Sequence, residues 1–158
     1  MSNTIDVFTD GGAINNSQNS PTGSAVYIPK YEFLVSMSEF GTNNTAELHA
    51  IQYALYLLKK NFEYFSPKTV NIVSDSMYAI NVVTGAHKAK TNKEFIAKCQ
   101  KYLNFFEEQH VTINFKWVHA HTGKIDYESK CNAIVDKAAN SVAEKLSTTN
   151  IPIQWHQN

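Results

Sequence analysis

The sequence predicts an α/β fold in which a mixed five-stranded sheet is flanked by helices. Three strand-like segments follow one another before the first helical segment, and the remainder then alternates between strands and helices. The chain has 158 residues, of which 43% are hydrophobic, and it shows no internal repeat. This length and composition favour one domain with a hydrophobic core and exclude an intrinsically disordered chain.

Alternating apolar and polar residues near the N-terminus indicate an antiparallel meander of three strands. The first strand begins near Ile5 and ends at Asp10-Gly11-Gly12. A polar loop is expected over residues 13–22. Two further strands are expected over residues 23–28 and 32–40.

The first helix is predicted to end at Lys60 and to pack one apolar face on the sheet. Asn43, Asn44 or Thr45 can cap its N-terminus, and Glu47 is expected in its first turn, where a carboxylate interacts favourably with the positive helix end. Apolar residues recur at helical spacing at Leu48, Ile51, Leu55 and Leu58.

The second half of the chain alternates between strands and helices. A strand over residues 70–73 precedes Asp75, and a short helix then continues to about Val83 and is closed by Gly85. The other expected elements are a helix over residues 91–108, a strand over 111–118, a polar loop over 119–130 and a last helix that ends near Leu146. We therefore expect one domain over residues 1–146 and a peripheral tail over 147–158.

Four carboxylates occupy positions from which they can converge. Asp10 and Asp75 each follow a strand, and if these strands are parallel neighbours, both side chains emerge at the carboxyl edge of the sheet, where α/β folds bind ligands. Glu47 lies at the start of the first helix and Asp136 in the last one. Converging carboxylates repel one another unless divalent cations such as Mg²⁺ neutralise them. Taken singly, each acid is more typical of a turn, a cap or a solvated position.

Composition excludes several other classes of protein. The apolar stretches are too short to cross a bilayer, no secretory leader is expected, and two cysteines are too few for a disulfide scaffold or a cysteine-based zinc site. We expect an intracellular protein, cytoplasmic or nuclear, with no membrane partner. The net charge is zero, with 14 lysines, no arginine and 14 acidic residues, which by itself argues against a nucleic-acid partner.

Five short segments give the chain a specific resemblance to a known family. They are FTDGG (Phe8–Gly12), NNTAELHAI (Asn43–Ile51), SDSMYAIN (Ser74–Asn81), WVHAHTGK (Trp117–Lys124) and NAIVDKAA (Asn132–Ala139). In this order they resemble type 1 ribonuclease H over roughly residues 4–146, in the compact single-domain form whose extended histidine loop carries H-T-G-K, as in some fungal and viral members. The resemblance implies a ribonuclease H-like fold, with three antiparallel strands, then two parallel strands, and helices on both faces.

The resemblance also implies an activity. Enzymes of this family are metal-dependent endoribonucleases that cut the RNA strand of RNA–DNA hybrids with Mg²⁺ or Mn²⁺ and leave 5′-phosphate and 3′-hydroxyl ends. His121 matches the mobile histidine that assists proton transfer or product release, and His119 is the competing candidate. A monomer with no obligate protein partner is expected. The acidic residues that would hold two metal ions are Asp10, Glu47, Asp75 and Asp136.

Contacts with the hybrid are implied at nine positions. Backbone amides at Gly11 and Gly12 would read ribose 2′-hydroxyls, the group that distinguishes RNA from DNA. Asn44 has a helix cap as its alternative role, and Met77 has a core position as its alternative. Thr42 and Asn92 resemble polar residues of a pocket that holds a phosphate of the DNA strand. The other implied contacts are Asn43, Ser76 and Lys93.

Three departures from the family pattern matter. The loop after Gly12 lacks the glycine-rich segment of many relatives, and residues 81–91 carry no tryptophan-bearing basic handle. The loop between His121 and Asp136 is longer than in the bacterial and animal enzymes. Because of that length, Asp126 is an alternative to Asp136 as the fourth acid.

Lysines gather where the handle is missing. Residues 84–104 contain five lysines against Glu94 alone, which suits phosphate contacts but is equally consistent with a solvated helix face. If four of the 14 acidic residues bind metal ions, ten acidic residues remain to offset the charge of 14 lysines. We therefore expect moderate affinity for the hybrid that falls steeply with salt. The five lysines are Lys88, Lys90, Lys93, Lys98 and Lys101.

Two other functions stay open at this point. One is a nuclease of the same fold with a different substrate, against which the NNTAEL segment and the motif around His121 argue. The other is a non-catalytic nucleic-acid-binding module, against which the presence of all four acids argues.

Overall fold

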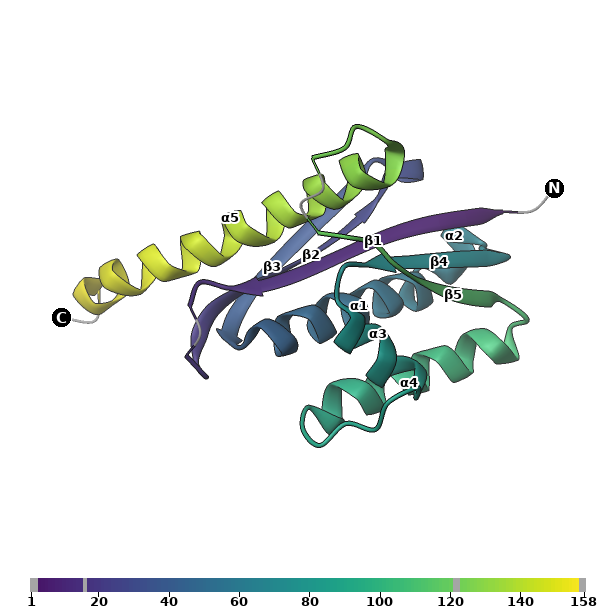
Figure 1. The fold of residues 1–158 in the computed structure, drawn as a ribbon, viewed down its shortest axis with the longest axis horizontal. Helices are drawn as coiled ribbons and strands as arrows, with labels where there is room; N and C mark the ends of the chain where they lie inside the picture. Colours follow the sequence, from purple (N-terminus) through teal and green to yellow (C-terminus); the bar gives the residue numbers. More distant parts are fainter. Residues whose placement is uncertain (1–2, 16, 121–122, 157–158) are drawn as a thin grey trace.

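The chain folds around one five-stranded mixed sheet, as the sequence predicts (Figure 1). The computed structural model describes residues 3–15, 17–120 and 123–156. β1, β2 and β3 pair antiparallel, whereas β4 is parallel to both β1 and β5. The sheet order is β3-β2-β1-β4-β5, and the strands are β1 (Thr4–Ala13), β2 (Ser20–Ile28), β3 (Phe33–Gly41), β4 (Thr69–Ser74) and β5 (Thr112–Trp117). The predicted fold class is therefore confirmed.

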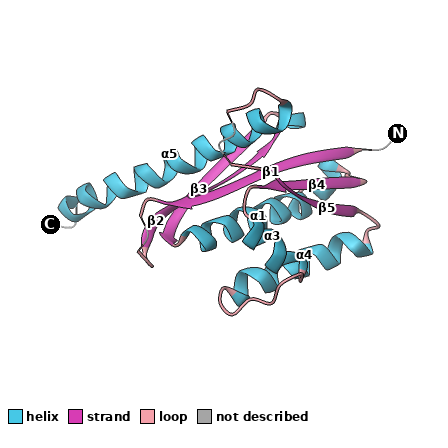
Figure 2. Cartoon of the chain, viewed as in Figure 1, coloured by secondary structure: helices cyan, strands magenta, loops and turns pink. Residues whose placement is uncertain are grey.

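Helices cover both faces of the sheet (Figure 2). They are α1 (Asn43–Lys60), α2 (Phe62–Phe65), α3 (Met77–Thr84), α4 (Lys93–Glu108) and α5 (Tyr127–His156), with a 3-10 turn at Pro29–Tyr31. α1, α3 and α4 lie on one face, and α5 crosses β1, β2 and β3 on the other (Figure 1). α3 and α4 form the crossover that the parallel strands β4 and β5 require.

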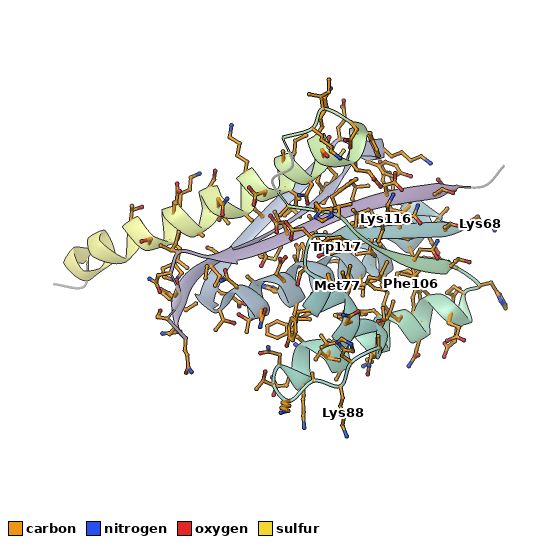
Figure 3. All side chains as sticks on the ribbon, in the orientation of Figure 1. Lys68, Met77, Lys88, Phe106, Lys116 and Trp117 are labelled. Atoms are coloured by element: carbon orange, nitrogen blue, oxygen red, sulfur yellow. The ribbon has the colours of Figure 1, made fainter. Side chains whose placement is uncertain are left out.

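Two apolar layers hold the helices on the sheet. The larger layer, beneath α1, α3 and α4, contains the four apolar residues that the helical spacing of α1 predicts, and Phe106 of α4 packs into it (Figure 3). The smaller layer lies under α5 and contains Phe8, Val73 and Val135. Val7 and Phe8 of β1 belong to different layers, so this central strand is buried on both faces.

β1 is longer than the sequence predicts. The strand continues to Ala13, because residues 10–13 all pair with β2. β2 itself begins at Ser20, so the loop expected over residues 13–22 is shorter. The predicted strand end at Asp10-Gly11-Gly12 is therefore one residue short, and Gly11 has a packing role that is described below.

α1 begins earlier than predicted, and a different residue caps it. The hydroxyl of Thr42 accepts a hydrogen bond from the backbone N–H of Thr45 at 3.1 Å, and the hydroxyl of Thr45 accepts from the backbone N–H of Thr42 at 2.9 Å. This reciprocal capping box makes Thr42 the N-cap, so the predicted caps at Asn43, Asn44 and Thr45 are wrong. Glu47 consequently lies in the second turn rather than the first, where the helix-end charge has little effect.

α5 also begins earlier than predicted, at Tyr127. Asp126 precedes the helix and caps it, since Asp126 Oδ1 accepts from the backbone N–H of Ser129 at 2.9 Å and Oδ2 accepts from the Ser129 hydroxyl at 3.2 Å. The polar loop expected up to residue 130 is therefore shorter.

The far end of α5 lies beyond its predicted limit near Leu146. The helix continues to His156. The division into a domain over 1–146 and a tail over 147–158 stays a prediction. Within the described part of the chain, no helix is both long and apolar enough to cross a membrane.

Candidate active site

The register of the parallel strands places Asp10 and Asp75 side by side. Thr9 of β1 is opposite Ser74 of β4 in the last pair of the parallel ladder. Asp10 and Asp75 are the next residues along the two segments, so both carboxylates lie at the carboxyl edge of the sheet, as predicted. Asp10 is only 4% exposed, because α1 and α5 pack on the two faces of β1.

Glu47 reaches the same point because α1 packs closely on β1 at Gly11. A Cβ atom at Gly11 would lie 2.3 Å from the backbone carbonyl of Ala46 and 2.6 Å from the backbone nitrogen of Glu47, so only glycine fits. As a result, one carboxylate oxygen from each of Asp10, Glu47 and Asp75 lies within 4.8 Å of the others. The backbone N–H of Gly11 donates to Asp10 Oδ1 at 2.9 Å. Gly11 is thus a packing residue, and its predicted contact with the substrate stays a prediction.

Asp136 reaches the cluster from α5, on the opposite face of the sheet. A side-chain hydrogen bond between Asp136 and Asp10 is among the causes that raise the pKa of Asp10. One turn further along α5, Asn140 Nδ2 donates to Asp136 Oδ2 at 3.3 Å. Asp126, in contrast, is exposed and caps α5. The structure therefore brings Asp136, and not Asp126, close to Asp10, although Asp136 lies outside the group of three carboxylates whose oxygens are within 4.8 Å of one another.

Burial and repulsion make the ionised form of this cluster unfavourable in the protein alone. Burial, followed by the charge of Asp75 and the contact with Asp136, raises the pKa of Asp10 from an ordinary value of 3.8 to about 9. Burial, followed by the charges of Asp10 and Asp75, raises the pKa of Glu47 well above its usual range. A hydrogen bond from the Gly11 backbone lowers both pKa values but does not offset these effects.

This donor set fits a hard divalent cation. All its ligand atoms are carboxylate oxygens, which Mg²⁺ and Mn²⁺ prefer. Glu47 Oε1 is buried and has no hydrogen-bond partner among the described residues, although buried polar atoms are nearly always satisfied. A bound cation would satisfy this oxygen and favour the ionised carboxylates.

Comparisons with known proteins identify the family of this chain. The sequence profile of the RNase H family matches residues 2–144. The chain belongs to the RNase H family. A probable ribonuclease H of Acanthamoeba polyphaga mimivirus is 32% identical over 150 residues, which cover 84% of this chain and 63% of the viral protein. Ribonuclease HI of Pasteurella multocida is 29% identical, and the match covers 98% of this chain and 99% of the bacterial one.

Solved structures of ribonuclease H share this fold. The N-terminal RNase H domain of a Mycobacterium tuberculosis protein has a TM-score of 0.69 and 19% identity, with 94% of this chain and 99% of that chain covered. LC11-RNase H1, isolated from compost, has a TM-score of 0.67 and 27% identity in its complex with an RNA/DNA hybrid, with 90% and 98% covered. The family and the enzyme class that the sequence resemblance implies are confirmed, whereas the H-T-G-K form of the loop stays a prediction.

Of the two candidate histidines, only His119 is among the described residues. His121 lies outside the described residues, so its catalytic role stays a prediction. His119 packs edge-on against Trp117, with ring centroids 4.3 Å apart. It also borders, together with Asn132 and Asp136, a cavity of about 150 Å³.

Ser76 and Met77 follow Asp75, the acidic residue just beyond the end of β4. Met77 is 48% exposed at the start of α3 (Figure 3), so the alternative of a core position is wrong. The hydroxyl of Ser76 accepts from the backbone N–H of Ala79 at 3.1 Å and caps α3. Contact of either residue with a hybrid stays a prediction.

The asparagines at the start of α1 are exposed beside the end of β1. Asn43 Oδ1 accepts from the backbone N–H of Ala13 at 2.7 Å. The side-chain oxygens of Asn43 and Asn140 lie 3.8 and 3.9 Å from the position that a Cβ of Gly12 would occupy. This leaves room at Gly12, unlike at Gly11, which supports the prediction that a substrate approaches the backbone here.

The three remaining predicted contacts belong to helix N-termini. Thr42 is engaged in the capping box of α1. Asn92 adopts a left-handed backbone with φ 61° before α4, and its Nδ2 donates to the Tyr78 hydroxyl at 3.2 Å. Lys93 is exposed at the first position of α4. No described contact joins Thr42 to Asn92, so the phosphate pocket stays a prediction.

Three residues near the carboxylates were not singled out from the sequence. Asn132 and Asn140 lie four residues before and after Asp136 and therefore share one stripe of α5, a spacing that could have indicated their role. Asn132 is 4% exposed, and its Oδ1 has no partner within the described residues. Trp117 Nε1 donates to the backbone oxygen of Asp75 at 3.1 Å and holds this residue to the end of β5. No sequence signal predicts a side-chain contact with a distant backbone.

Without divalent cations, Asp10→Asn should be more stable than wild type at neutral pH. The pKa of Asp10 is about 9 in the folded protein and about 3.9 in an unfolded chain. Between these values the folded protein binds more protons than the unfolded chain, so the free energy of unfolding falls as pH rises. We expect a gain of roughly 1–3 kcal/mol at pH 7 that vanishes below about pH 4.

Thermal unfolding in EDTA between pH 4 and 8 measures this effect. Adding Mg²⁺ should then raise the melting temperature of wild type more than that of Asp10→Asn, because binding to the folded state is stabilising. A variant that melts below wild type at pH 8 in EDTA would contradict the repulsion described here.

Proposed function

We propose that this ribonuclease H is an endoribonuclease that hydrolyses the RNA strand of RNA–DNA hybrids and leaves 5′-phosphate and 3′-hydroxyl ends. The observation that carries the proposal is the convergence of Asp10, Glu47 and Asp75 at the carboxyl edge of the sheet, with Asp136 beside Asp10. Carboxylates alone would repel a phosphodiester, so the cluster suits phosphoryl transfer only when it holds cations.

We propose Mg²⁺ as the cofactor, with two ions per site when substrate is bound and Mn²⁺ as a substitute. When bound, such ions activate a water and stabilise the leaving oxygen of an in-line displacement. Asp10 interacts with Asp75 and with Asp136, so it would hold cations together with both of these residues. Trp117 and Asn140 are positioning residues, because they hold the backbone of Asp75 and the carboxylate of Asp136.

The hybrid is proposed to lie across the rim of this cluster. Exposed side chains around it come from the start of α1, at Asn43 and Asn44, and from the start of α3, at Met77. The open space at Gly12 would let a ribose 2′-hydroxyl approach the backbone. The 27% identical LC11-RNase H1 crystallised with an RNA/DNA hybrid, which supports the same substrate here. A monomeric, intracellular enzyme without an obligate protein partner is part of this proposal.

Cleavage of end-labelled duplexes tests the proposed reaction. With Mg²⁺, we expect internal cuts in the RNA strand of a hybrid and none in duplex RNA or duplex DNA, and EDTA should abolish all cleavage. The upstream fragments should be extendable by a polymerase, which requires a 3′-hydroxyl.

Each of the other candidate functions has its own outcome in this experiment. Binding of the hybrid without turnover in Mg²⁺ or Mn²⁺ would indicate a non-catalytic module. Trimming from an end, or cutting of duplex DNA, would indicate a nuclease with a different substrate.

A further inference from the structure

A groove lined by lysines and tyrosines lies between α1 and α4, which pack side by side on the face opposite α5 (Figure 1). Its volume is about 470 Å³, within the range of sites that bind small ligands. No carboxylate contributes to its lining. The lining residues are Tyr56, Lys59, Lys60, Lys98, Lys101 and Tyr102.

The groove is separate from the carboxylate cluster. Lys59 follows Glu47 by twelve residues on α1, which is about 18 Å along the helix axis. On α4, Lys101 lies more than two turns beyond Lys93, the residue predicted to contact the hybrid. A ligand in the groove would therefore be bound outside the site of cleavage.

The ammonium groups of the groove have no acidic partners among the described residues. Ion pairs outside the groove join His49 to Glu39 and Lys116 to Glu128. Lys59 Nζ instead lies 4.9 Å from the ring centroid of Phe105, and Lys60 Nζ lies 5.7 Å from that of Tyr56. Four like charges without counter-charges create a positive potential that a polyanion would neutralise.

We propose that this groove binds a single strand of nucleic acid, with phosphates on Lys60, Lys98 and Lys101 and a base against Tyr102 or Tyr56. A cationic groove with aromatic side chains is the combination that binds single strands without sequence preference. Lys98 and Lys101 are three residues apart, so they project from one face of α4 and can contact one backbone. A duplex fits less well, because its bases are stacked on one another and cannot reach the tyrosines.

Binding of a fluorescent ten-residue oligothymidylate, measured by anisotropy in EDTA, tests this inference without any cleavage. Lys98→Gln/Lys101→Gln should weaken binding several-fold at low salt and reduce the slope of log K against log salt by about 1.4, since each phosphate contact on a single strand contributes about 0.7. Lys130→Gln/Lys137→Gln is the matched control. Both of its lysines are exposed on α5, which lies on the opposite face of the sheet from α1 and α4 (Figure 1). This control should leave the slope unchanged.

A stacking contribution separates a specific groove from general charge attraction. Tyr102→Leu should weaken binding of the oligothymidylate but not of an abasic strand of the same length. Equal losses in the two double-lysine variants, or equal losses of the two strands with Tyr102→Leu, would overturn the proposal. Displacement of the strand by ATP at a lower concentration than by unlabelled oligothymidylate would also overturn it, because the site would then favour free nucleotides. Thermal melts of all variants verify that they fold. These measurements do not depend on whether the enzyme cleaves a hybrid.

Discussion

Replacing Asp10 with asparagine should reduce the rate of hybrid cleavage at least about a thousandfold, equivalent to about 4 kcal/mol of transition-state stabilisation. Asp10 is buried, it interacts with Asp75 and Asp136, and its charge contributes to the raised pKa of Glu47. An asparagine keeps the shape of the side chain but removes the charge that would hold a cation. The measurement is the single-turnover rate on a labelled hybrid at saturating Mg²⁺.

Asp6→Asn is the matched control for this prediction. Asp6 lies on the same strand, where Oδ1 accepts from Asn71 Nδ2 at 2.9 Å and Oδ2 accepts from the Tyr127 hydroxyl at 3.0 Å. The control removes one carboxylate charge from β1 without changing the cluster, so it should cleave at close to the wild-type rate. If Asp10→Asn kept a tenth of the wild-type rate, Asp10 would not belong to the site.

The order of the elements was predictable because each follows from a local pattern. The helical spacing of Leu48, Ile51 and Leu55 identifies the buried face of α1 without any knowledge of its neighbours. The end of β1 was not predictable in this way. In the sequence Gly11 indicates only the end of a strand, whereas its packing role depends on the backbone of Ala46, which is far along the chain. Strand ends are therefore misjudged where a glycine serves close packing.

The residues of the candidate site were predictable from the sequence only where strand pairing or family resemblance identifies them. Asp10 and Asp75 follow from the parallel pairing of β1 with β4. Glu47 was expected in the first turn of α1 for an electrostatic reason. It lies in the second turn, and it reaches the carboxylate cluster because α1 approaches β1 closely at Gly11. Trp117 contributes through a hydrogen bond to a backbone oxygen, which any residue type presents, so its role required the folded structure.

Asp136→Asn and Asp126→Asn should separate catalysis from helix capping on α5. Asp136 lies close enough to Asp10 to raise the pKa of Asp10, so its loss should lower the cleavage rate at least about a hundredfold, or about 3 kcal/mol. Asp126 is exposed and holds the first turn of α5 through Ser129. Its replacement should leave the cleavage rate close to wild type and lower the melting temperature slightly, because asparagine still caps α5 but the negative charge at the positive end of the helix is lost.

These two opposite outcomes, loss of cleavage in one variant and loss of stability in the other, decide which aspartate is the fourth acid. Each variant is the control for the other. The two residues are ten positions apart on one segment, and both replacements remove one charge and keep the side-chain shape. Rates on a labelled hybrid and melting temperatures in EDTA are measured for both proteins. If Asp126→Asn lost cleavage without a change in melting temperature while Asp136→Asn stayed active, the acidic site would extend into the histidine loop. The contact between Asp136 and Asp10 would then be structural, and Asp126 would replace Asp136 among the metal-binding residues.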